Sequence, residues 1–204
     1  MGKLVFTFGA MGSGKSTALL QLLSGIEDSP NKVLCLRPSV DTRDLVGFIT
    51  ARSTDFKYPC LTVSSVGCIA EFVNEFAVNL GILSIICVDE AQFLTKAQVE
   101  ELAWFADKGV DVYCFGLRTD SNGFLFDGSA RLLELADELV YLESECSCGR
   151  PAVINAKFDS DGRFVPFSDN VIDTGGDMKY TPVCRKCWCR LYGDFLQSLD
   201  ASND

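Results

Sequence analysis

The 204-residue sequence contains no histidine, and this absence excludes every mechanism that depends on an imidazole. The Ser-His-Asp triad, the Cys-His pair and histidine coordination of a metal ion are all ruled out. Any general base in this protein must therefore be a carboxylate, a lysine, a tyrosine or a cysteine.

Positive charge is also scarce. The chain carries 18 Lys and Arg against 28 Asp and Glu, which gives a formal net charge of -10 and a sequence pI of about 4.5. The electric field of such a protein repels polyanions. We therefore expect no nonspecific binding of DNA or RNA, and nucleic acid is not among the predicted partners.

Long apolar runs are missing as well. No run approaches the roughly 20 apolar residues that a membrane-spanning helix requires, and the start MGKLVFTFGAMG is too short and too glycine-interrupted for a signal peptide. Five cysteines stand singly, several inside apolar segments where a reduced thiol packs as a small hydrophobe: Cys35, Cys60, Cys68, Cys87 and Cys114. These features predict a cytoplasmic protein in a reducing compartment, without a membrane partner.

The hydrophobic residues, 48% of the chain, follow a repeating order. Short, nearly continuous apolar runs alternate with helical patterns, as in a parallel sheet that is covered on both faces. We expect strands at 3–8, 32–37, 82–88 and 110–116 and helices at 15–24, 66–79 and 95–108, the last opened by a Thr95–Gln98 capping box. The segment 38–59 is polar and is expected to be irregular, whereas 127–143 is typical of a helix followed by a final strand.

A phosphate-binding loop follows the first predicted strand. The sequence satisfies GxxxxGK[ST] and runs directly into a helical pattern, as the motif requires: Gly9, Ala10, Met11, Gly12, Ser13, Gly14, Lys15, Ser16 and Thr17. The glycines let backbone amides turn toward phosphate oxygens, Lys15 can reach the β and γ phosphates, and the Ser16 hydroxyl can bind Mg²⁺. The motif predicts an α/β fold of the P-loop NTPase type (RecA-like), with ATP and Mg²⁺ as cofactors.

Two adjacent carboxylates, Asp89 and Glu90, end the apolar run at 82–88. Open α/β sheets place ligands at this edge, so Asp89 is predicted to hold Mg²⁺ and Glu90 to act as general base. Lys15 joins Glu90 as a candidate catalytic residue, and Gln92 is predicted to lie at the nucleotide. The alternative is an acidic N-terminus that merely stabilises the helix beginning near Thr95.

Cysteines are paired near the C-terminus, where four thiolates suit a structural zinc ion: Cys146, Cys148, Cys184 and Cys187. Cys189 is an alternative to Cys187, and buried free thiols or a redox pair remain the alternatives to a metal site. We expect a main domain at 1–143, a small zinc-binding module at 144–192 and a flexible tail at 193–204.

Five blocks in order, GAMGSGKSTALLQLL, VDEAQFLTKAQVEEL, YCFGLRTDSNGFLFDGS, CSCGRPA and YTPVCRKC, resemble the type II thymidine kinases, and specifically their bacterial and phage branch. The resemblance implies a P-loop kinase domain with a zinc-bearing lasso, ATP-dependent phosphorylation of the thymidine 5′-hydroxyl, a homotetramer and feedback inhibition by the triphosphate end product. It assigns Glu90 the role of proton acceptor and implies these nucleoside-binding residues: Phe93, Phe126, Ile172, Asp173, Thr174, Gly175 and Tyr180.

One departure from the family concerns the base pocket. After Thr119-Asp120 the family usually continues with an aromatic residue and an arginine, whereas this chain has Ser121 and Asn122. A missing ring would weaken base contact by about 0.5 to 1.5 kcal/mol and broaden selection toward deoxyuridine or an analogue. Arg43 and Arg52 are further candidates for stabilising phosphate charge. A nucleotide sensor without catalysis is the rival from another class, and a DNA-stimulated ATPase is disfavoured by the acidic charge.

Overall fold

The computed structural model describes residues 2–26, 32–39, 47–51, 53–80, 82–166 and 179–201. Its main body is a six-stranded, fully parallel sheet in the order β5-β2-β6-β7-β1-β8. The strands are β1 (Leu4–Phe8), β2 (Val33–Pro38), β5 (Leu61–Val63), β6 (Ile85–Val88), β7 (Asp111–Gly116) and β8 (Glu138–Tyr141). β7 therefore lies between β1, which leads into the phosphate loop, and β6, which leads into the acidic pair.

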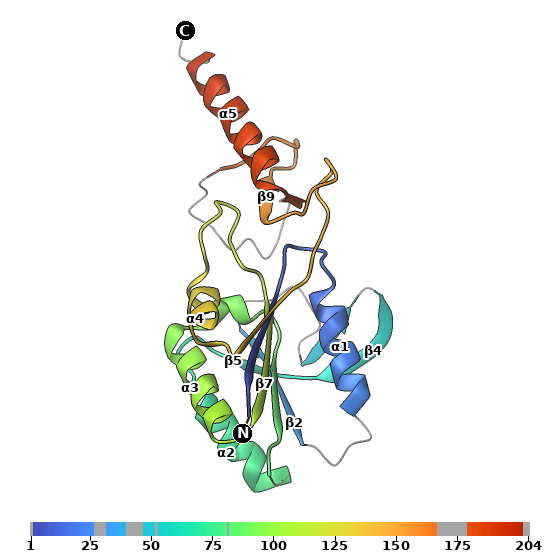
Figure 1. Cartoon of the computed structure of the whole chain (residues 1–204), viewed down its shortest axis with the longest axis vertical. Helices are drawn as coiled ribbons and strands as arrows, with labels where there is room; N and C mark the ends of the chain where they lie inside the picture. Colours follow the sequence, from blue (N-terminus) through green and yellow to red (C-terminus); the bar gives the residue numbers. More distant parts are fainter. Residues whose placement is uncertain are drawn as a thin grey trace.

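Helices cover both faces of this sheet (Figure 1). They are α1 (Lys15–Ile26) on one face and α2 (Ile69–Leu80), α3 (Lys96–Asp107) and α4 (Asp127–Leu135) on the other. Successive strand residues enter opposite cores: Leu34 and Leu36 pack beneath α2 and α3, whereas Cys35 packs against α1. This burial on both faces explains why the strands read as continuous apolar runs, and it confirms the predicted α/β class.

The element boundaries differ little from the predicted ones. α2 begins at Ile69 rather than at 66, and the predicted helix and strand within 127–143 are α4 and β8. The capping box of α3 is present, since the Thr95 hydroxyl accepts from the Gln98 amide at 3.2 Å and the Gln98 side chain accepts from the Thr95 amide at 3.0 Å.

The expectation of an irregular segment at 38–59 is wrong for its second half. β3 (Phe48–Ala51) and β4 (Thr54–Pro59) form an antiparallel hairpin that packs against α1. The rings of Phe56 and Tyr58 alternate with exposed polar residues along β4, and both rings pack on the core beneath α1. Just one face of this hairpin is buried, so about half of its residues are polar. The segment therefore lacks the continuous apolar run from which the other strands were predicted.

A smaller body lies beyond the carboxyl edge of the sheet (Figure 1). It contains the antiparallel pair β9 (Ile154–Phe158) and β10 (Lys179–Val183) and the helix α5 (Arg185–Ala201). α5 continues through Gly193 to Ala201, over part of the segment 193–204 that was predicted as a tail. Across the described residues, no helix is long and apolar enough to cross a membrane.

Candidate active site and cysteine cluster

The phosphate loop connects β1 to α1, and its shape requires glycine. Gly12 and Gly14 have positive φ angles of 76° and 84°, a region that is costly for other residues. A Cβ atom at Gly9 would lie 2.4 Å from the Leu142 carbonyl oxygen and 2.5 Å from Ser13 Oγ. The loop therefore has the close backbone turn that lets amides surround a phosphate group.

Lys15 is the first residue of α1 and is nine-tenths buried. Its ammonium group donates to the Ala10 carbonyl at 2.8 Å and lies 3.4 Å from both the Gly9 carbonyl and Ser13 Oγ. These contacts hold the cation beneath the loop, where it and the positive end of the α1 dipole favour an anionic ligand.

Asp89 leaves β6 as a buried carboxylate that is ion-paired with Arg37. The distance between Arg37 Nη2 and Asp89 Oδ2 is 2.9 Å, and the two side chains are 6% and 4% exposed. Arg37 was not among the predicted site residues; its signal in the sequence is a charged residue at the end of the apolar run KVLCLR. The predicted phosphate arginines, Arg43 and Arg52, lie outside the described residues.

Glu90 has a strained backbone and a fixed side chain. Its φ of 52° and ψ of 38° make it the left-handed exception among the described non-glycine residues. The Gln92 Nε2 amide donates to the Glu90 carboxylate, and Gln92 Oε1 accepts from the Leu117 amide at 2.9 Å. Backbone strain of this kind concentrates at functional sites. The structure thus places Gln92, which was predicted to lie at the nucleotide, in contact with Glu90, the candidate general base.

Two predicted nucleoside residues are brought together. The rings of Phe93 and Phe126 meet edge to face with centroids 5.6 Å apart, beside a cavity of about 550 Å³. Tyr180 lies on β10, opposite Lys157 of β9. The remaining predicted nucleoside residues, Ile172 to Gly175, lie outside the described residues.

The segment with the unusual Ser121 contacts the smaller body. Ser121 is 6% exposed, and its carbonyl accepts a hydrogen bond from Trp188 Nε1 of α5 at 3.0 Å. Nearby, the Thr119 hydroxyl donates to the Val153 carbonyl at 3.3 Å. An indole from α5 thus lies at the position where the resemblance implies an aromatic ring, a contact that was not predicted from the sequence.

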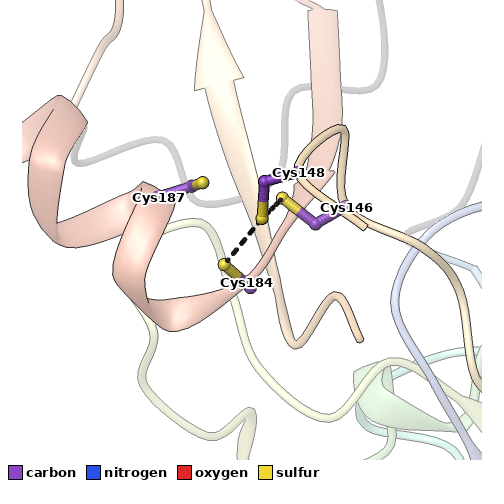
Figure 2. A group of neighbouring side chains, drawn as sticks. All are labelled: Cys146, Cys148, Cys184 and Cys187. Carbon is purple, nitrogen blue, oxygen red and sulfur yellow. Dashed lines mark hydrogen bonds between the residues drawn. The ribbon is translucent and has the colours of Figure 1, made fainter. Parts of the chain in front are cut away.

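Four cysteine sulfurs converge from two distant segments (Figure 2). The sulfurs of Cys146, Cys148, Cys184 and Cys187 all lie within 4.8 Å of one another, and Cys148 is 3.6 Å from both Cys146 and Cys184. A tetrahedral site with Zn–S bonds of about 2.3 Å separates its sulfurs by about 3.8 Å. Among the described residues Cys189 is exposed and stands outside this group.

Backbone amides favour the thiolate form of Cys146 and Cys184, whereas hydrogen bonds with the Cys148 and Cys184 sulfurs raise the pKa of Cys187 to about 12. Amides of Cys148 and Cys184 donate to Cys146 and lower the pKa of its thiol to about 6, and the Cys187 amide lowers the pKa of Cys184. Thiolates are the form that binds zinc, so the cluster fits a structural Cys₄ zinc ion. By contrast, burial raises the pKa of Cys114, which packs in the core as a small hydrophobe.

Comparison with known proteins identifies the chain's family. The thymidine kinase family model matches residues 2–188. The chain is 39% identical to a thymidine kinase of Chromobacterium violaceum, over 92% of this chain and 98% of that protein. It is 37% identical to the thymidine kinase of Enterobacteria phage T4, over 94% and 97% of the two chains.

A Legionella pneumophila thymidine kinase is 37% identical over 91% of this chain and 88% of its own length. Among solved structures, the Pif1 helicase from Candida albicans aligns with a TM-score of 0.41 and 17% identity, over 70% of this chain and 36% of that one. The family match over nearly the whole length agrees with the phosphate loop, the acidic strand end and the cysteine cluster: this chain belongs to the thymidine kinase family.

Proposed function

We propose that this protein is an ATP-dependent thymidine kinase that transfers the γ-phosphate of ATP to the thymidine 5′-hydroxyl and forms thymidine monophosphate. The observation that carries this function is the placement of two groups at one sheet edge. The phosphate loop leaves β1, and the buried Asp89 and the strained Glu90 leave β6, two strands away. Open α/β sheets bind their ligands at this edge, outside the carboxyl ends of the strands.

The phosphate loop from Gly9 to Thr17 binds the triphosphate. Its amides and the Lys15 ammonium neutralise charge on the phosphates, and Gln92 holds the neighbouring Glu90 carboxylate through its side-chain amide. The Ser16 hydroxyl and the Asp89 carboxylate are hard oxygen donors of the kind that Mg²⁺ prefers. When bound, Mg²⁺ supplies charge neutralisation on the transferred phosphoryl group. Most of the rate then comes from positioning and electrostatic stabilisation, because phosphoryl transfer needs little covalent help from the protein.

Glu90 accepts the proton of the attacking 5′-hydroxyl. A carboxylate suits this role because the chain has no histidine, and the hydrogen bond from Gln92 keeps the Glu90 side chain in one orientation. Phe93 and Phe126 form an aromatic wall for the pyrimidine, and Tyr180 with residues 172–175 completes the nucleoside site. Cys146, Cys148, Cys184 and Cys187 bind the zinc ion, which has a structural role. We further propose a cytoplasmic homotetramer inhibited by its triphosphate end product.

A kinase with shifted base preference is the second candidate, favoured by one observation. Ser121 replaces the family's aromatic residue, and Trp188 approaches it from α5. If the indole does not restore the lost ring contact, deoxyuridine is phosphorylated at a rate closer to that of thymidine.

A phosphoryl-transfer assay tests these proposals together. Mg-ATP is supplied with thymidine, deoxyuridine, deoxycytidine or deoxyguanosine, and monophosphate formation is measured for the wild type and for Glu90→Gln. We expect thymidine monophosphate from the wild type and a loss of about 10²- to 10⁴-fold in the variant, with ATP binding retained. A folded, zinc-containing, ATP-binding protein that phosphorylates none of the four would refute the kinase and favour a nucleotide sensor.

A further inference from the structure

The phosphate loop is hydrogen-bonded to a residue that lies 144 positions away. The Met11 amide, at the tip of the loop, donates to the side-chain oxygen Asn155 Oδ1 at 2.8 Å. Asn155 is on β9, in the smaller body that approaches the loop between β1 and α1 (Figure 1). Neither the loop motif nor the cysteine motif includes this residue.

Asn155 is firmly held in place. Its side chain is 4% exposed, and its backbone pairs with Pro182 in the β9–β10 ladder. The loop itself enters the apolar core of this body, since Ala10 packs with Ala152, Ile154 and Ala156. A buried amide side chain needs its hydrogen bonds satisfied, so the Met11 contact has a defined geometry and a cost if it is lost.

The glycines of the phosphate loop make its backbone flexible, so a hydrogen bond from outside the loop restricts its conformation. Gly12 follows the Met11 amide directly and Gly14 lies two residues further on, both with positive φ, and glycine populates positive and negative φ about equally. Without an external contact, the segment between Ala10 and Gly14 has several accessible backbone conformations. Ordering it on ligand binding would then reduce the affinity for a triphosphate.

We propose that Asn155 is a positioning residue of the phosphate loop: it fixes the Met11 amide and so preorganises the loop for the triphosphate of ATP. The inference rests on the proposed ATP site. It also gives the zinc module a role in nucleotide binding, because β9 and β10 lie between the two pairs of clustered cysteines.

Three substitutions separate this role from a merely structural one. Asn155→Leu removes the acceptor at similar volume, and Asn155→Ser keeps a polar side chain that is too short to reach Met11. Asn155→Asp retains an oxygen acceptor. The matched control is Phe158→Leu, which changes a partly buried neighbour in the same strand whose ring lies against Phe164, away from the Met11 bond.

The first measurement is amide hydrogen exchange of the ligand-free, zinc-containing protein. We expect the amides of residues 10–14 to exchange faster in Asn155→Leu and Asn155→Ser, and to remain protected in Asn155→Asp and Phe158→Leu. This readout does not depend on activity. Equal protection of the loop in all variants would overturn the proposal, and Asn155→Ser keeps the test decisive if Asn155→Leu does not fold.

The second measurement is the Kd for ATP, by calorimetry without nucleoside. Asn155→Leu and Asn155→Ser are expected to bind ATP about 3- to 10-fold more weakly than the wild type, with Phe158→Leu unchanged. The KM for thymidine and kcat should stay near their wild-type values. If both Asn155 variants bind ATP as tightly as the wild type, the positioning role of Asn155 is refuted and the proposed ATP site is not. If the wild type does not bind ATP, or binds it no better than Lys15→Ala, the proposed ATP site itself is wrong.

Discussion

Arg37 and Asp89 form a buried ion pair, with 2.9 Å between Nη2 and Oδ2, that joins the carboxyl ends of the neighbouring strands β2 and β6. Removing one partner of such a pair leaves a buried charge without its counter-ion, which typically costs about 3 to 5 kcal/mol. We therefore expect Arg37→Met to lower the free energy of unfolding by about that amount, measured by urea denaturation.

A double variant is the control for this pair. Arg37→Met with Asp89→Asn buries no charge at either position, so it should regain much of the lost stability while remaining poorly active. A loss of stability below about 1 kcal/mol in Arg37→Met would show that the pair is not important for folding.

Gln92 is expected to control the orientation of Glu90. Gln92→Met keeps the length of the side chain but removes the amide that joins the Glu90 carboxylate to the Leu117 backbone. Because a misplaced catalytic group reduces rate steeply, we expect kcat to fall about 10- to 100-fold with little change in the Kd for ATP. Steady-state kinetics and calorimetry measure the two quantities.

Gln98→Met is the matched control for Gln92→Met. Gln98 is another buried glutamine, and its side chain donates to the carbonyls of Ser64 and Gly67. Its loss should lower stability and leave kcat near the wild-type value. Equal effects of the two substitutions on kcat would mean that Gln92 acts only through folding.

The zinc ligand set is tested by a pair of serine variants on one helix. Cys187 belongs to the sulfur cluster, whereas Cys189, two residues further along α5, is exposed and outside it. We expect one zinc per chain in the wild type and in Cys189→Ser, and strongly reduced zinc in Cys187→Ser, measured by elemental mass spectrometry on dialysed protein. Zinc retained by Cys187→Ser but lost from Cys189→Ser would reverse the assignment.

Trp188 links α5 to the segment around Ser121. Trp188→Phe keeps an aromatic ring but removes the Nε1 donor, which leaves the Ser121 carbonyl without this hydrogen bond. The expected loss of stability is about 1 kcal/mol, from thermal or chemical unfolding. If the indole also contributes to the base site, the ratio of thymidine to deoxyuridine turnover changes in parallel; an unchanged ratio would confine Trp188 to a structural role.

The local features of this protein were readable from its sequence. The phosphate loop is a run of consecutive residues whose backbone geometry depends on its own glycines, so Gly9, Gly12 and Gly14 revealed it directly. The four central strands β1, β2, β6 and β7 were predictable because strands buried on both faces are apolar throughout, whereas the short, largely exposed edge strand β5 was not predicted. The capping box of α3 is similarly a matter of two residues three positions apart.

Contacts between distant segments were decided by the tertiary structure alone. The choice between Cys187 and Cys189 depended on which side of α5 faces Cys146, and the β3–β4 hairpin depended on packing against α1. Asn155 and Arg37 gained their roles from partners 144 and 52 residues away. A pattern in sequence records the burial and backbone preference of each residue, whereas the partner of a buried polar side chain is set by which elements the packing of the core brings together.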